Sequence, residues 1–185
     1  MTNLSIDDPF LKRLKSHTET HWAQATIKPG GYGFRFQRGT LWNPGLTDLQ
    51  ITEYEKTLHV RFPDDFRCML RFMNGTNIPQ LNVYVFCGEP HRTSPGVYAY
   101  PRDLEIVQKL IQEIREDRKE IQQVLAEEGF TLTANMGLVP LFGHRYIVCT
   151  SDPSQSTVLS IEGTDAIVYG NTLRIYLESE FVNML

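Results

Sequence analysis

Residues 46–79 read LTDLQITEYEKTLHVRFPDDFRCMLRFMNGTNIP, and this stretch predicts two short helices because the ends of both are marked. Thr47 and Gln50 have the spacing of a capping box, in which a hydroxyl and a side-chain amide satisfy backbone donors left unpaired at a helix start. A helix should therefore begin near Asp48. Its apolar face follows helical spacing and comprises Ile51, Tyr54 and Leu58, with Glu55 on the border.

Pro63 predicts the end of that helix and the start of a second one, since proline suits a first helical turn, where its missing N–H is not needed. We expect Asn74 and Gly75 to close the second helix, because a left-handed C-terminal residue is best supplied by Gly and next best by Asn. Gly75 should then have a positive φ. The second apolar stripe should be buried, and it comprises Phe66, Met69, Leu70 and Met73.

These features resemble the signature of the SUKH superfamily, which includes the fungal Smi/Knr cell-wall assembly regulators and many bacterial toxin-immunity proteins. A second segment, residues 138–148 followed by residues 158–181, is similar to the C-terminal half of a bacterial branch of the family. The resemblance covers about residues 46–181. The residues assigned to the structural signature are Thr47, Glu55, Pro63, Phe66, Leu70, Asn74, Gly75 and Asp165.

The resemblance implies a single α+β domain with a mostly antiparallel central sheet flanked by helices. Residues 1–45 have no clear counterpart in the family and are expected to pack on this domain as an N-terminal extension. The family works by binding other proteins, so the resemblance implies a protein partner and no catalytic residues.

Composition agrees with one soluble binding domain. With 185 residues, of which 41% are hydrophobic and 22% charged, the chain is long enough for one substantial core and short for two. The net charge of −4 argues against a nucleic-acid partner and predicts an acidic and aromatic contact surface. Neither a signal peptide nor an apolar run of about 20 residues, the length of a membrane span, is present, so we expect a cytoplasmic protein without membrane contact.

Further elements follow from periodicity and from turn residues. We predict an N-terminal helix over residues 9–25, an aromatic strand around residues 32–36 and a strand over residues 81–86. One long helix is predicted over residues 103–128, followed by four short strands and a terminal helix. The strands are expected at residues 138–142, 146–149, 158–161 and 167–169, and the terminal helix over residues 173–181.

The cysteines and histidines give no pattern typical of a metal site. Cys68, Cys87 and Cys149 are odd in number and far apart, which favours reduced thiols in or near the core. His17 and His21 share one helix face, but HTETH lacks the Glu directly after the first His that a zinc protease requires. We therefore predict no metal and no cofactor.

The segment from Gly143 to Tyr146 is the first candidate for partner contact, because it places a titratable ring and a guanidinium on a turn that enters a strand. His144, Arg145 and Tyr146 are the partner-binding candidates there. The alternative is structural: Arg145 pairs with Asp165 and fixes the edge of the sheet.

A second candidate region is aromatic and basic. Packing on the core is the favoured interpretation of its aromatic side chains, and partner contact, above all through Tyr32 and Arg35, is the alternative. The region comprises Lys28, Tyr32, Phe34, Arg35, Phe36, Arg38 and Trp42.

The sequence thus predicts a protein-binding module without catalysis, most simply an immunity protein that neutralises a cognate bacterial toxin. The alternative is a regulatory scaffold of the Smi/Knr type. A third reading is a hydrolase centred on His144, with Asp152 or Asp165 and with Ser160 or Cys149. No G-x-S-x-G motif holds either nucleophile, which is why we expect no enzyme.

Overall fold

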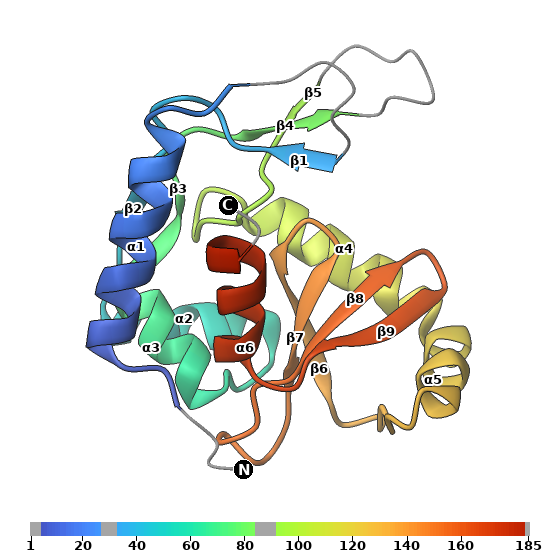
Figure 1. The fold of residues 1–185 in the computed structure, drawn as a ribbon. Helices are drawn as coiled ribbons and strands as arrows, with labels where there is room; N and C mark the ends of the chain where they lie inside the picture. Colours follow the sequence, from blue (N-terminus) through green and yellow to red (C-terminus); the bar gives the residue numbers. More distant parts are fainter. Residues whose placement is uncertain (1–4, 27–32, 84–91, 184–185) are drawn as a thin grey trace.

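A four-stranded antiparallel meander lies at the centre of the structure, a computed structural model that describes residues 5–26, 33–83 and 92–183 (Figure 1). Its strands follow chain order and are β6 (Gly137–Phe142), β7 (Arg145–Cys149), β8 (Val158–Glu162) and β9 (Asp165–Gly170). Successive side chains alternate between its two faces, so Ile147 joins one apolar cluster while Tyr146 and Val148 join another. The meander therefore has an apolar core on each of its two faces.

The first signature helix, α2 (Asp48–Leu58), begins at the predicted capping box, with both of its hydrogen bonds present between Thr47 and Gln50. It ends earlier than predicted. His59 adopts a left-handed conformation with φ 56° and terminates α2 four residues before Pro63. Pro63 is instead the N-cap of α3 (Asp64–Phe72), in which Phe66 and Leu70 are buried as expected.

The predicted C-cap at Asn74 and Gly75 is wrong. Helix α3 ends at Phe72, and both residues lie in β3 (Met73–Thr76), which pairs with β2 (Trp42–Pro44). Strand pairing with β2 thus replaces a helix cap. Gly75 does have the expected positive φ, 64°, but the reason is different: a Cβ there would lie 2.5 Å from the Cβ of Ala99.

Asn74 fixes the same neighbouring loop from its side chain. Its Nδ2 donates to the carbonyl oxygen of Tyr100 at 2.6 Å, and its Oδ1 accepts from the Tyr100 N–H at 2.9 Å. This pair of bonds imitates a strand pairing and holds residue 100 against β3.

The N-terminal helix α1 (Asp8–Trp22) packs on the same apolar cluster as α2 and α3 through Phe10, Leu11 and Leu14. Trp22 stacks on Phe36 at 4.2 Å between ring centroids. The predicted core packing of the aromatic region is confirmed for Phe34, Phe36 and Trp42, whereas Lys28 and Tyr32 lie outside the described residues.

A small three-stranded sheet covers one end of the molecule. Its order is β1 (Gly33–Arg35), β4 (Gln80–Val83) and β5 (Arg92–Ser94), all antiparallel. Arg35 is exposed on β1, and the predicted strand at residues 81–86 is described only as far as Val83.

The predicted long helix is broken into α4 (Leu104–Glu116) and α5 (Arg118–Glu127) at Asp117. Val107 and Ile111 of α4 belong to one apolar cluster, whereas Ile114 of α4 joins Ile121 and Leu125 of α5 in the other. The α4–α5 segment therefore contributes to both cores, and its direction changes at Asp117. The terminal helix α6 (Leu173–Glu178) lies on the face opposite to α5 and continues into one π-helical turn, η1 (Ser179–Asn183).

The chain is therefore a single α+β domain whose sheets are antiparallel and whose central sheet is flanked by helices, as predicted. Within the described ranges, none of the helices combines the length and apolar character needed to cross a membrane.

Candidate functional site

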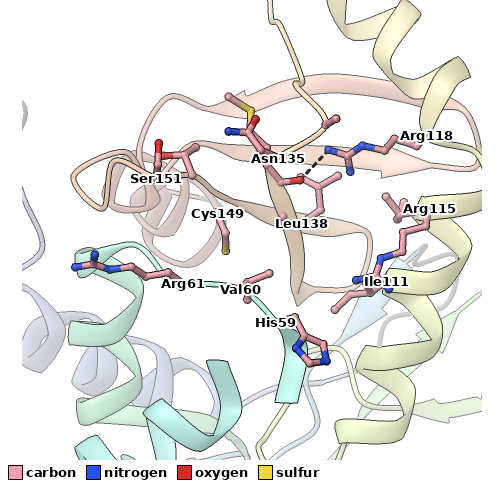
Figure 2. A pocket seen from close by; sticks show the side chains of 15 residues that line it. His59, Val60, Arg61, Ile111, Arg115, Arg118, Asn135, Leu138, Cys149 and Ser151 are labelled. Carbon is pink, nitrogen blue, oxygen red and sulfur yellow. Dashed lines mark hydrogen bonds between the residues drawn. The ribbon is translucent and has the colours of Figure 1, made fainter. Parts of the chain in front are cut away.

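A groove of about 500 Å³ opens where the α2–α3 connection, the α4–α5 junction and the start of β6 meet (Figure 2). Six of its lining residues are exposed, so it is a surface groove rather than an enclosed cavity. The exposed residues are His59, Arg61, Arg115, Ala134, Asn135 and Ser151. The remaining walls come from the ends of β6 and β7.

The charged side chains that line this groove are arginines. Arg115 and Arg118 line the groove from the α4–α5 side, and Arg61 lies on the opposite side, where its side chain extends away from the other two (Figure 2). Among the described residues, none of the three forms an ion pair. Of the nearby carboxylates, Glu113 pairs with Lys109 and Glu116 accepts from Gln112. Asp117 lies between the two arginines in sequence but, among the described residues, forms no ion pair with either of them.

Arg118 is held in place by the loop that precedes β6. Its Nη2 donates to the carbonyl oxygens of Thr133 at 2.8 Å and of Met136 at 2.7 Å. Its Nε is buried without a hydrogen-bond partner among the described residues. Burial, and then the neighbouring Arg115 charge, lower the pKa of the Arg118 guanidinium. Two like charges thus lie close together without a counter-charge.

The floor of the groove is apolar and closely packed. It is formed by Val60, Ile111, Leu138 and Cys149. Gly137 is required for close approach here, because a Cβ would lie 2.5 Å from Cγ1 of Val60. Cys149 is only 3% exposed, and burial raises the pKa of its thiol to about 12. The thiol is therefore protonated at neutral pH and is no nucleophile.

The opposite end of β7 holds the predicted contact segment, and there Arg145 is structural. Its Nη1 donates to Oγ of Ser160 at 2.7 Å, and its guanidinium lies 3.9 Å from the ring centroid of Tyr169. Its Nε is 3.9 Å from Oε2 of Glu180, and this pair is largely buried. The predicted Arg145–Asp165 pair is wrong, because Asp165 is exposed at the β8–β9 turn.

The other two residues of that segment differ in exposure. Tyr146 is 4% exposed within the core beneath α5, so it offers no surface to a partner, and we correct that part of the prediction. His144 is half-buried in the β6–β7 turn. Burial and the adjacent Arg145 lower its pKa, against the opposite effect of Glu162, so the ring is neutral at pH 7.

Glu180 illustrates how desolvation competes with pairing. Burial raises the pKa of its carboxyl group, and this effect exceeds the opposite influence of Arg145 and of a hydrogen bond from Tyr169. The 3.9 Å separation explains the outcome: the ion pair is too long to include a hydrogen bond.

The signature residue Glu55 joins the two signature helices. Its Oε1 accepts the N–H of Phe62 at 2.7 Å, and its Oε2 pairs with Arg67 of α3. Both groups are largely buried, so the acidic position within α2 orients α3 against it.

The residues of the alternative hydrolase are distributed over both ends of the central sheet. His144 and Cys149 lie at opposite ends of β7, roughly 17 Å apart at the usual rise per residue of a strand. Ser160 accepts a hydrogen bond from Arg145, and in the described ranges it has none with His144. His17 and His21 are both exposed on α1, and among the described residues no three His, Cys, Asp or Glu side chains are placed to hold a metal ion.

No protein-family model matches the chain, and no curated protein is significantly similar to it. The similarity to the SUKH superfamily therefore stays a prediction.

The groove itself was not predicted from the sequence. Its arginines come from separate segments, and each looks like an ordinary surface cation when read alone. The one local signal is the spacing of Arg115 and Arg118. They are three residues apart and so fall on one face of the single long helix that the sequence predicts.

Proposed function

We propose that this chain is a protein-binding module without catalysis, which uses the groove beside Arg115 and Arg118 as its contact face. We further propose that it acts in the cytoplasm as an immunity protein and neutralises a cognate toxin. The observation that carries the binding proposal is the set of three groove arginines without an ion pair among the described residues.

Arginine is well suited to such a surface. It is enriched at the energetic centres of protein interfaces, because its planar fork forms several hydrogen bonds and its stem buries apolar area. The groove offers these cations above an apolar floor, while the thiol in that floor is protonated and buried. The arrangement supports recognition of another protein, and the SUKH-like signature supports a toxin as that protein.

Neutralisation would then be steric and electrostatic. A bound immunity protein covers the toxin's active site or substrate surface, and complementary charge sets the rate and specificity of encounter. This mechanism needs one equivalent of the protein per toxin.

The test begins with the product of the gene next to the one that encodes this chain. Its expression in a heterologous host should arrest growth, and co-expression of this chain should restore growth. With purified proteins, inhibition should reach completion at one equivalent. The toxin should regain activity once it has been separated under denaturing conditions and refolded alone.

Two results would contradict the proposal. Inactivation of the toxin at far below one equivalent, with a covalent change in its mass, would indicate an enzyme. A stable complex in which the partner keeps full activity would instead support the regulatory scaffold.

A further inference from the structure

We infer that the groove binds an extended acidic segment of the protein partner, with its carboxylates received by Arg115 and Arg118 and with Arg61 at the opposite wall. The inference rests on the proposed function, since it names the chemistry of the partner's contact segment. It also reverses the expectation of an acidic contact surface that the net charge of −4 suggests.

The wall of the groove formed by Arg115 and Arg118 carries a local positive charge. Arg115 lies in the same groove wall as Arg118 and contributes to lowering its pKa, while Glu113 and Glu116 have Lys109 and Gln112 as partners. Asp117 forms no ion pair with either arginine among the described residues. A pair of like charges without a counter-charge is unfavourable in the free protein, and a partner carboxylate removes that repulsion as it forms its own bonds. The surface is therefore complementary to an anion although the whole chain is acidic.

The Arg118 side chain is held in place before any partner binds. Arg118 is anchored by two bonds from Nη2 to the carbonyls of Thr133 and Met136, while its Nε is buried. The Nη1 donors have no partner among the described residues. A guanidinium that is already immobile loses little side-chain entropy when it binds a carboxylate, so more of the interaction energy appears as affinity.

The open shape of the groove favours an extended ligand over a small anion. The walls include exposed residues from the α2–α3 connection, from α4 and from both strand ends, so a small anion would leave most of its surface in water. An extended peptide segment can instead follow the groove. Val60, Ile111 and Leu138 in the floor would accept apolar side chains that lie between the acidic ones.

A peptide-binding assay tests the inference without any toxin. The probe is a short fluorescein-labelled peptide that alternates glutamate with leucine, and the matched control replaces every glutamate with glutamine. Fluorescence anisotropy at low salt should show saturable binding of the glutamate peptide and at least about ten-fold weaker binding of the control, because charge-assisted bonds to arginine are lost. Raising the salt concentration should weaken binding of the glutamate peptide and should leave binding of the glutamine control unchanged.

Variants then locate the site. Arg115→Gln should weaken binding of the glutamate peptide about ten-fold, as expected for loss of a charge-assisted contact. The matched control is Arg38→Gln, which removes the same charge from an exposed site on another part of the surface and should leave the affinity unchanged. Melting temperatures of both variants should equal that of the parent, which separates lost contact from lost folding.

Three outcomes would overturn the inference: equal binding of the two peptides, equal affinities of the two variants, or displacement of the peptide by inorganic phosphate at sub-millimolar concentration. Failure of the proposed function is distinguishable. A toxin that is neutralised equally well by the Arg115→Gln variant overturns the inference and leaves the immunity proposal standing. Tight binding of the glutamate peptide without neutralisation of any neighbouring gene product does the reverse.

Discussion

Arginine side chains lie near both ends of β7, in opposite surroundings. At its beginning, Arg145 is covered by Tyr169, bonded to Ser160 and paired with Glu180. Beyond its end, Arg115 and Arg118 line an open groove and have no carboxylate among the described residues. The first arginine completes the fold, Arg118 is anchored to the carbonyls of Thr133 and Met136 through Nη2 alone, and Arg115 is left for a ligand.

Residue type alone therefore does not identify a contact site. Arg145, beside His144 on a turn, has the sequence context of a binding residue, yet only 15% of its side chain is exposed. Its Nη1 is bonded to Ser160, and its guanidinium faces Tyr169 and Glu180 within the domain. Arg115 has the context of an ordinary solvated helix residue, yet it lines the groove. What separates them is the presence or absence of an internal counter-charge.

The largest effect should come from removing the paired arginine. Arg145→Met should lower the free energy of unfolding by about 3 kcal/mol at pH 7, because it leaves the Glu180 carboxylate buried without its partner. Urea denaturation measures the loss. The loss should shrink at pH 5, where Glu180 can take up a proton.

The control is the double variant Arg145→Met, Glu180→Leu. Replacing both partners by apolar side chains should restore much of the stability, so the two changes should be strongly non-additive. Additive losses would show that Arg145 acts through Ser160 and Tyr169 rather than through Glu180.

A smaller effect is the pH dependence that Glu180 introduces. Burial raises the folded-state pKa of this carboxyl above its ordinary value of 4.5. The folded protein then binds more protons than the unfolded chain above that pH, so this group's contribution is complete below pH 4.5 and is lost as the pH rises through the folded pKa. Glu180→Gln should therefore flatten the stability profile over that window.

Melting temperatures of parent and variant between pH 4 and pH 8 provide the measurement. Glu113→Gln, on the exposed side of α4, is the control and should leave the profile unchanged. A profile that rises through the same window in the parent and is flat in Glu180→Gln would contradict the sign of the shift.

Prediction from the sequence succeeded where the signal was local. The start of α2 at Thr47 and the strands of the meander are encoded within a few neighbouring residues, as caps, alternation and turn glycines. Pairing of Arg145 could not be predicted in this way. Asp165 is a neighbour along the hairpins, whereas Glu180 enters from a π-helical turn that helical spacing does not indicate.

The same reason applies to Asn74, Gly75 and the groove. Asn-Gly after an apolar stripe is typical of a helix end, but pairing of β3 with β2 takes over at Met73. The groove needs the break of the predicted long helix at Asp117, which brings Arg118 against the loop before β6. No glycine or proline marks that break in the sequence, so periodicity alone predicts a continuous helix.

A third prediction concerns the anchored groove arginine. Arg118→Gln should cost about 1 kcal/mol, the usual net worth of hydrogen bonds of this kind, because the carbonyls of Thr133 and Met136 lose their donor. Lys119→Gln removes the same charge from the neighbouring exposed position and should cost nothing measurable. Hydrogen exchange should quicken at residues 133–136 only in the first variant.

Replacement of Arg115 should have the smallest effect on stability. This result would distinguish the unpaired groove arginine most clearly from the paired Arg145. Its side chain is exposed, and in the part of the chain that the structure describes it has neither a hydrogen bond nor an ion pair. Arg115→Gln removes a like charge beside Arg118, so the free energy of unfolding should stay within about 0.5 kcal/mol of the parent or rise slightly. Urea denaturation at low salt gives the number, and high salt should abolish any gain, since it screens the repulsion. A loss above about 1 kcal/mol would mean that Arg115 stabilises the fold much as Arg145 does. Arg115 would then not be available to receive a carboxylate of the partner.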